Sequence, residues 1–142
     1  MNALTRFSAS LTTWSSLKRN AHMPKPYQLS LQHKYLEQIQ SGQKTVEGRV
    51  ATPRFKSIHP GDHIQFFSSE DKNYSLLCKV LSIGRYESFR QMLEKEGLEK
   101  CLPGVQTLEK GEEIYHQFPN YKANAKRYGV RAIRIEIEKG SL

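Results

Sequence analysis

The sequence is poor in cysteine, with two in 142 residues, and it contains no long hydrophobic run. Two cysteines do not form the disulfide framework of a small secreted domain, so we expect Cys78 and Cys101 to be reduced thiols. Neither these cysteines nor the five histidines have the paired spacing of a zinc site, and we predict no metal and no cofactor. No apolar run approaches the roughly 18 residues of a membrane span, so we expect a soluble protein with no membrane partner.

Acidic residues are absent from residues 1–22, which are rich in serine and threonine and carry three basic residues. Apolar side chains recur there at helical spacing, a composition typical of an organellar transit peptide. Two alternatives are a disordered tail and an upstream start ahead of Met23. We expect residues 1–22 to lie outside the fold, so that their removal leaves folding intact. We expect a cytoplasmic protein. If residues 1–22 are a transit peptide, the location is instead mitochondrial or another organelle.

Acidic residues are also scarce in the whole chain. It has 14 of them and 22 lysines and arginines, which gives a formal net charge of +8. Three of these charges lie in residues 1–22, so +5 remains for residues 23–142 (8 − 3 = 5). A basic surface of this kind favours polyanions as partners, through steering and counterion release. The length suits one domain with its own core, and we expect that domain to span residues 23–142.

Three ionisable residues are concentrated in the stretch from Ser41 to Val50, which begins with a glycine turn and continues as a strand. Side chains alternate along a strand, so Glu47 and Arg49 share one face with Thr45. Lys44, at the turn, is expected to be free to swing, and its removal to cost no more than about 0.5 kcal/mol of stability. Such a cluster can hold a phosphate, read a base edge or move a proton. The alternative is a solvated edge strand with an ion pair worth about 0–1 kcal/mol.

The rest of the chain predicts strands and helices around this stretch. Residues 27–31 alternate as a half-buried strand does, and residues 33–40 form one amphipathic helix that ends at Gly42. Residues 51–60 and 98–104 are expected to be irregular. Further strands are predicted at residues 63–67, 74–86 and 129–138. The strand at 74–86 is apolar on both faces, so we expect it to be central in the sheet. Further helices are predicted from Ser88 to Gly97 and from Thr107 to Phe118.

Several side chains outside the motif are candidates for a site. Glu96 returns to the buried side of its helix, where an apolar setting would raise its pKa and suit a general acid, although a frayed helix end is the alternative. Tyr115 and Tyr121 lie in a segment with many basic residues, which is typical of a surface that binds single strands. The alternative is that these tyrosines pack a helix against the barrel. Arg131 is predicted on the inward face of the last strand.

The loop at residues 51–60 carries Arg54 beside Phe55. An aromatic ring among basic residues next to the motif would stack on a base and clamp a nucleotide. The alternative is that Phe55 is a plug that holds the loop on the barrel.

The motif also resembles a known family. The run G-Q-K-T-V-E-G-R from Gly42 to Arg49 fits Gly-x-Lys-x-x-Glu-x-Arg, the signature of the ASCH domain, a relative of the PUA RNA-binding domains. Three further matches lie at residues 35–39, 60–66 and 129–135, and the resemblance extends from about Tyr27 to Glu138. It implies an α+β fold: a small PUA-like mixed β-barrel of about five or six strands, with helices packed at its ends and the motif in a cleft.

ASCH domains are associated with RNA metabolism as binding modules, as nucleases or, in one branch, as amidohydrolases of N4-acetylcytidine. That branch uses the motif lysine, a threonine three positions later and a glutamate on a later helix. Lys44 matches the lysine and Glu96 falls about where that glutamate is expected, but Glu47 occupies the threonine position. Because of this departure, Glu47 would instead act as a general base on water, with Lys44 stabilising the oxyanion and Glu96 protonating the leaving amine.

Our first hypothesis is an RNA- or nucleotide-binding domain with a cleft that contains lysine, glutamate and arginine. The second is a metal-independent hydrolase of a modified nucleoside or of RNA, and the third is a protein-interaction adaptor. Convergence of the three catalytic candidates on one enclosed pocket would favour chemistry, and an open basic groove would favour binding. The oligomeric state stays open. The catalytic candidates are Lys44, Glu47 and Glu96, and the binding candidates are Lys44, Arg49, Arg54, Tyr115, Tyr121 and Arg131.

Overall fold

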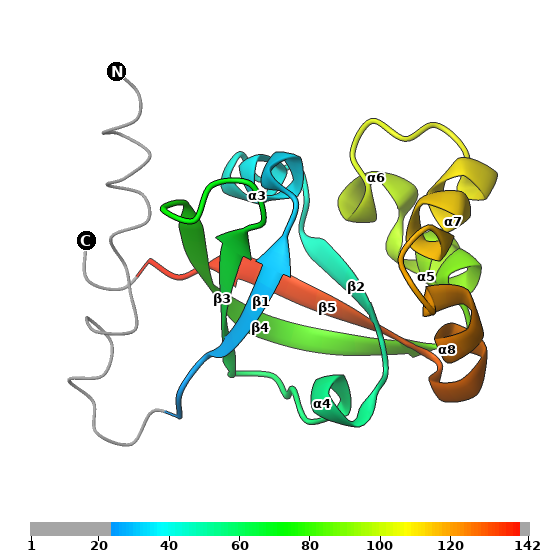
Figure 1. The fold of residues 1–142 in the computed structure, drawn as a ribbon, viewed down its shortest axis with the longest axis horizontal. Coiled ribbons are helices and arrows are strands. Elements are labelled where there is room, and N and C mark those ends of the chain that lie inside the picture. The colour runs from blue at the N-terminus through cyan, green and yellow to red at the C-terminus, as the bar shows by residue number, and fades with distance from the viewer. Residues whose placement is uncertain (1–23, 140–142) are drawn as a thin grey trace.

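The computed structural model describes residues 24–139, and the expectations for residues 1–22 lie outside this range. Its elements are α-helices and β-strands of one mixed fold (Figure 1). The strands are β1 Tyr27–Leu31, β2 Val46–Val50, β3 His63–Ser68, β4 Ser75–Tyr86 and β5 Val130–Ile137. The helices are α3 His33–Gln40, α4 Pro53–Lys56, α5 Phe89–Glu96, α6 Leu98–Cys101, α7 Leu108–His116 and α8 Tyr121–Tyr128.

The five described strands form one sheet in the order β1-β3-β4-β5-β2. β1 runs parallel to β3, and the other neighbours are antiparallel. The sheet curls into a half-barrel in which β1 and β2 are the two edges (Figure 1). β4 lies in the middle, as its apolar sequence predicted, and the α+β barrel-like fold is confirmed.

Apolar side chains gather in two cores, one on each face of the curled sheet. The concave core includes Leu36 of α3, Phe66 of β3 and Ile133 of β5. The other core lies between the β2–β5 side of the sheet and helices α5 to α8, which form a layer beside the sheet (Figure 1). Alternation along β5 explains this division, since Ala132 contacts the helical layer while Ile133 faces the concave core.

Local signals placed the helix ends correctly in several cases. α3 occupies residues 33–40, and Gly42 follows it with a φ of 86°, a conformation that favours glycine. Ser88 caps α5 by accepting a hydrogen bond from Gln91 N at 3.1 Å. Thr107 caps α7 in the same way, accepting from Lys110 N at 3.1 Å. These caps satisfy backbone donors that a helix leaves unpaired at its start.

Three short helices were not predicted. α4 lies within the expected loop 51–60, and α6 replaces the irregular connection after Gly97. α8 follows Asn120, which has a left-handed φ of 64° and makes no side-chain cap. Thr52 before Pro53 and Asn120 before Tyr121 are start signals that the sequence reasoning did not use, whereas α6 follows Gly97 without a side-chain cap. Within residues 24–139, no helix is long and apolar enough to cross a membrane.

Candidate functional site

Strand β2 brings Glu47 and Arg49 to the concave face of the sheet, as the alternation predicted. Their neighbours Val46 and Val50 contact the helical layer instead. Cross-strand register places Glu47 opposite Ile133 of β5, a residue of the concave core. The motif therefore lies at an edge of the half-barrel, beside the helices that cover its other face.

Lys44 is buried, with only 2% of its surface exposed. Its ammonium donates to Val46 O at 2.7 Å and to Cys101 O at 2.6 Å, and it lies 3.3 Å from Glu47 Oε1. An ammonium has three N–H donors, so these three acceptors use its full capacity. The expectation that Lys44 swings freely as a surface group is therefore wrong, because the carbonyl of Cys101 in α6 and the Glu47 carboxylate hold it.

The Glu47 carboxylate is 5% exposed and lies between two cations. Its Oε2 accepts from Arg49 Nε at 2.7 Å, and its Oε1 faces Lys44. Burial alone would raise the pKa of Glu47, but the charges of Arg49 and Lys44 outweigh burial and lower it. The group is therefore ionised near neutral pH. A carboxylate has about four acceptor positions, so Glu47 retains about two for a ligand.

Arg49 connects the carboxylate to the opposite edge of the half-barrel. Its Nη2 donates to Ser30 O of β1 at 3.1 Å, while its guanidinium carbon lies 5.5 Å from the centre of the Phe55 ring. The Arg49 side chain also hydrogen-bonds Tyr121, which opposes the rise that burial causes in the pKa of Tyr121. Arg49 therefore fixes Glu47 and connects it to β1 and to Tyr121.

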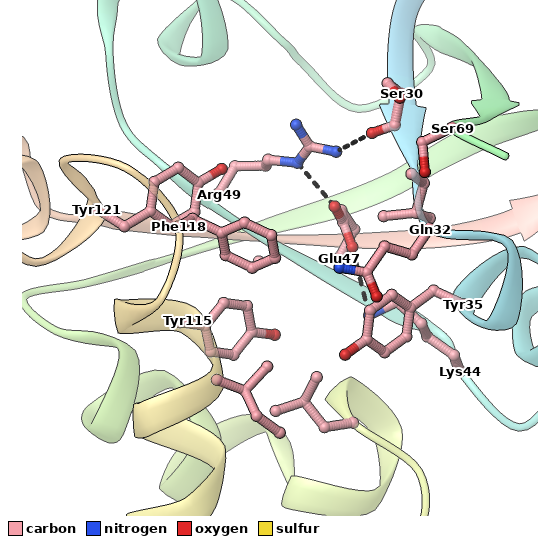
Figure 2. A pocket seen from close by; sticks show the side chains of 14 residues that line it. Ser30, Gln32, Tyr35, Lys44, Glu47, Arg49, Ser69, Tyr115, Phe118 and Tyr121 are labelled. Carbon is pink, nitrogen blue, oxygen red and sulfur yellow. Dashed lines mark hydrogen bonds and ion pairs between the residues drawn. The ribbon is translucent and has the colours of Figure 1, made fainter.

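A cavity of about 330 Å³ lies between this charged group and the helices. Figure 2 shows aromatic side chains of α7 and the following residues on one side, and Glu47, Gln32 and Tyr35 on the other. The volume falls at the lower end of the range of about 300–1,000 Å³ that small-molecule pockets have. The lining residues with polar or aromatic side chains are Ser30, Gln32, Tyr35, Lys44, Glu47, Arg49, Ser69, Tyr115, Phe118 and Tyr121.

The Tyr115 hydroxyl is a fully buried polar group of this cavity that has no hydrogen-bond partner in the described residues. Tyr115 is 5% exposed, and its ring stacks on Phe89 with centroids 4.2 Å apart. Burial raises the pKa of Tyr115 well above its ordinary value, with a smaller contribution from Glu47, so the hydroxyl keeps its proton. An unpartnered buried hydroxyl carries a desolvation cost of about 1–3 kcal/mol unless a ligand or water pairs with it.

Gly48 allows this close approach of β2 to the helical layer. A Cβ atom at Gly48 would lie 2.7 Å from Met92 Cε and 3.1 Å from Tyr115 Oη. Glycine therefore lets the strand backbone lie against α5 and α7 with the tyrosine between them.

The family comparison agrees with the motif and with the fold. The model of the ASCH domain matches residues 29–139, which is most of the chain. This chain belongs to the ASCH domain family.

Solved structures give the same fold for this ASCH domain. The hypothetical protein PH0355 is 41% identical, with a TM-score of 0.72, and the match covers 80% of this chain and 100% of that one. Protein PF0455 from Pyrococcus furiosus is 40% identical, with a TM-score of 0.66 and coverages of 81% and 99%. A mutant of ZmASCH from Zymomonas mobilis shares the fold at 15% identity and a TM-score of 0.51, covering 80% of this chain and 70% of that one. No curated protein matches the sequence significantly.

Glu96 does not join Lys44 and Glu47 in the ASCH cavity. It pairs with Arg134, whose Nε and Nη2 lie 2.8 and 2.5 Å from its oxygens, and it also accepts from the Tyr86 hydroxyl. The hydrogen bond from Arg134 lowers the pKa of Glu96, although burial opposes this. The expected rise in this pKa is therefore wrong. Lys44 and Glu47 line the cavity, and the convergence of all three candidates is not seen.

The binding candidates fall into two groups. Arg49, Tyr115 and Tyr121 line the cavity together with Lys44. Arg54 is exposed on α4 and donates to Gln28 O of β1 at 2.9 Å, outside the lining. Arg131 lies opposite Arg49 in the β2–β5 register and is also outside the lining.

Phe55 is half-buried against the concave core, which agrees with the interpretation of this ring as a plug. Its ring also lies 5.5 Å from the guanidinium carbons of both Arg49 and Arg54. The plug therefore stacks against the two arginines that reach β1.

Sequence reasoning missed Gln32, Ser69 and Phe118 in the cavity lining. Phe118 lies three residues after Tyr115, a spacing that marks one helical face, and this signal was available. Gln32 and Ser69 are isolated polar residues at the ends of β1 and β3, where nothing local distinguishes them. Among residues 24–139, no three His, Cys, Asp or Glu side chains cluster as metal ligands would.

Proposed function

We propose that this ASCH domain, which we assign to residues 23–142, binds RNA or a nucleotide by taking one base or nucleoside into the cavity, and that it acts in RNA metabolism. The observation that carries the proposal is a pair of unused polar groups in one aromatic cavity. Glu47 has spare acceptor positions, and the Tyr115 hydroxyl has no partner among the described residues. Membership of a family related to RNA-binding domains supports the same ligand class.

Five of the lining residues have a role in this proposal. The rings of Phe118 and Tyr121 provide faces on which a base stacks, and such stacking is worth about 1–3 kcal/mol per base. Glu47 accepts from a base amino or imino group, while Tyr115 hydrogen-bonds a neighbouring polar atom. Lys44 has no donor left for a ligand and therefore acts by holding Glu47 in place.

Titration of nucleosides and short single-stranded RNAs against the full chain tests this proposal. We expect at least one nucleoside to bind, and Tyr115→Phe to weaken it by roughly three- to tenfold, the value of one hydrogen bond. The matched control is Tyr128→Phe, a tyrosine outside the cavity lining that should leave the affinity unchanged. Absence of binding by every nucleoside and RNA, or equal loss in both variants, would contradict the proposal.

The second candidate is a metal-independent hydrolase of a modified nucleoside or of RNA. The observation that favours it is that Lys44 and Glu47 line one cavity. Glu47 would take a proton from water, while the Tyr115 hydroxyl is placed to stabilise charge on the substrate. Glu96 would reach the leaving group only after breaking its hydrogen bonds to Arg134. The lowered pKa of Glu47 makes this carboxylate a weak base.

A panel of acylated nucleosides and short RNAs, followed by mass spectrometry, tests the second candidate. A hydrolase forms product, and Glu47→Gln stops turnover while substrate still binds. A binding domain forms no product, and the same substitution changes affinity alone. Product formation that persists in Glu47→Gln would remove this residue from the catalytic role.

A further inference from the structure

Three arginines lie directly opposite one another on neighbouring strands. The β2–β5 register pairs Arg49 with Arg131, and the β4–β5 register pairs Arg131 with Arg85. Directly opposite residues point to the same face of a sheet, with Cβ atoms about 4.5–5.5 Å apart. The three side chains therefore form a row about 10 Å long across β2, β5 and β4, which we call the arginine row.

Arg49 pairs with Glu47, but the other two members of the arginine row lack charge compensation in the described residues. Arg85 is exposed and Arg131 is half-buried, and neither makes a side-chain hydrogen bond or an ion pair within residues 24–139. Burial, and then the neighbouring charge of Arg85, lower the pKa of Arg131. Like charges directly opposite each other destabilise a sheet, so packing gives no reason for this arrangement.

The row begins at the cavity. Arg49 lines the cavity, where it pairs with Glu47 and hydrogen-bonds Tyr121. The ring of Phe55 lies 5.5 Å from both Arg49 and Arg54, so a fourth cation lies next to the first member of the row. The positive charge thus extends from the cavity across the sheet.

We propose that the arginine row binds the phosphodiester backbone of a single RNA strand whose base occupies the cavity. This inference rests on the proposed function, because the cavity supplies the base that sets the position of the strand. A single strand fits because the base must be unstacked to enter. Guanidinium groups match phosphate oxygens with two parallel hydrogen bonds, and neighbouring arginines at this spacing can hold one phosphate together or two in succession.

Fluorescence anisotropy with a labelled oligoribonucleotide tests the row, at several salt concentrations and with the full chain. Each lost phosphate contact should reduce the slope of log K against log salt by about 0.7, which corresponds to about a fivefold loss at 0.1 M salt. We expect this loss in both Arg85→Gln and Arg131→Gln, whatever the sequence of the RNA. Lys79→Gln is the control, because it removes one positive charge from an exposed position of β4, the strand that carries Arg85. Lys79 lies opposite Glu136 and outside the arginine row.

Nucleoside binding separates the row from the cavity. A nucleoside carries no phosphate, so its affinity should be the same in Arg85→Gln as in the unchanged protein. An unchanged salt slope in both row variants, or an equal change in Lys79→Gln, overturns the row while the proposed function stands. Row variants that weaken RNA binding while Tyr115→Phe affects neither ligand would support the row and contradict the proposed cavity. Absence of RNA binding with nucleoside binding intact would overturn the row alone, and absence of both would overturn the row and the proposed function.

Discussion

Replacing Lys44 by alanine removes an ammonium group that three buried oxygen atoms share. The carbonyls of Val46 and Cys101 lose a donor at 2.7 and 2.6 Å, and Glu47 loses one of its two cations. A buried polar group without a partner costs about 1–3 kcal/mol, and breaking a buried ion pair costs about 3–5 kcal/mol. Arg49 still pairs with Glu47, and water from the cavity can reach part of the gap. We therefore expect a loss of about 3 kcal/mol in the free energy of unfolding.

The assay is equilibrium unfolding in urea, followed by far-ultraviolet circular dichroism. A loss of about 3 kcal/mol corresponds to a fall in the thermal midpoint of roughly 10 °C for a domain of this length. Lys72→Ala is the control, since it removes an exposed lysine from the β3–β4 turn and should change stability by less than about 0.5 kcal/mol.

A double substitution tests the physical cause. Glu47→Gln removes the charge that Lys44 neutralises, so Lys44→Ala should cost less in that background than alone. Equal costs in both backgrounds would mean that the carbonyl contacts, and not the ion pair, account for the loss. A loss in Lys44→Ala no larger than in Lys72→Ala would refute the reasoning altogether, because the ammonium would then be dispensable to the fold.

Three further predictions follow from the same geometry. Tyr115→Phe should leave the thermal midpoint unchanged or raise it, because it removes a buried hydroxyl without a partner; a large fall would reveal a hydrogen bond that the unliganded fold needs. Glu96→Gln should lower the free energy of unfolding by about 1–3 kcal/mol through its contact with Arg134, with nucleoside affinity unchanged; a weaker affinity would place this residue in the site. The lowered pKa of Glu47 means that its charge stabilises the fold above the ordinary glutamate pKa of about 4.3 and that this stabilisation disappears as the pH falls through the lowered folded-state pKa. The stability difference between the unchanged protein and Glu47→Gln, measured in urea from pH 7 to pH 3, should therefore be constant at first and shrink in acid; a difference that grows in acid would contradict the sign of the shift.

The sequence predicted the elements whose signals are local. β1 and α3 have the predicted bounds, because alternation and a glycine stop lie within those segments. α8 was missed although Asn120 is a common N-cap residue, because Ala125 is the one buried residue of this helix and no apolar stripe marks it. Burial of Lys44 could not be predicted, since its partner carbonyl at Cys101 is 57 residues away and backbone acceptors carry no sequence signature.

The site was predicted in part for the same reason. Lys44, Glu47 and Arg49 belong to one short motif, so their proximity follows from strand geometry alone. Glu96 was assigned to the wrong neighbours because its partner Arg134 is 38 residues away, and only the folded sheet brings the two together. The unpaired state of Tyr115 depends on the shape of the cavity, which no local pattern specifies.

The two arginines that reach β1 also protect the protein from association with other chains. β1 is an edge strand, and Gln28 and Ser30, two residues apart, direct their carbonyls away from β3. Open edges of this kind pair readily with strands of other molecules and lead to aggregation. Arg54 and Arg49 cover these two carbonyls with charged groups, so an incoming strand would have to displace both guanidiniums before it could add to the sheet.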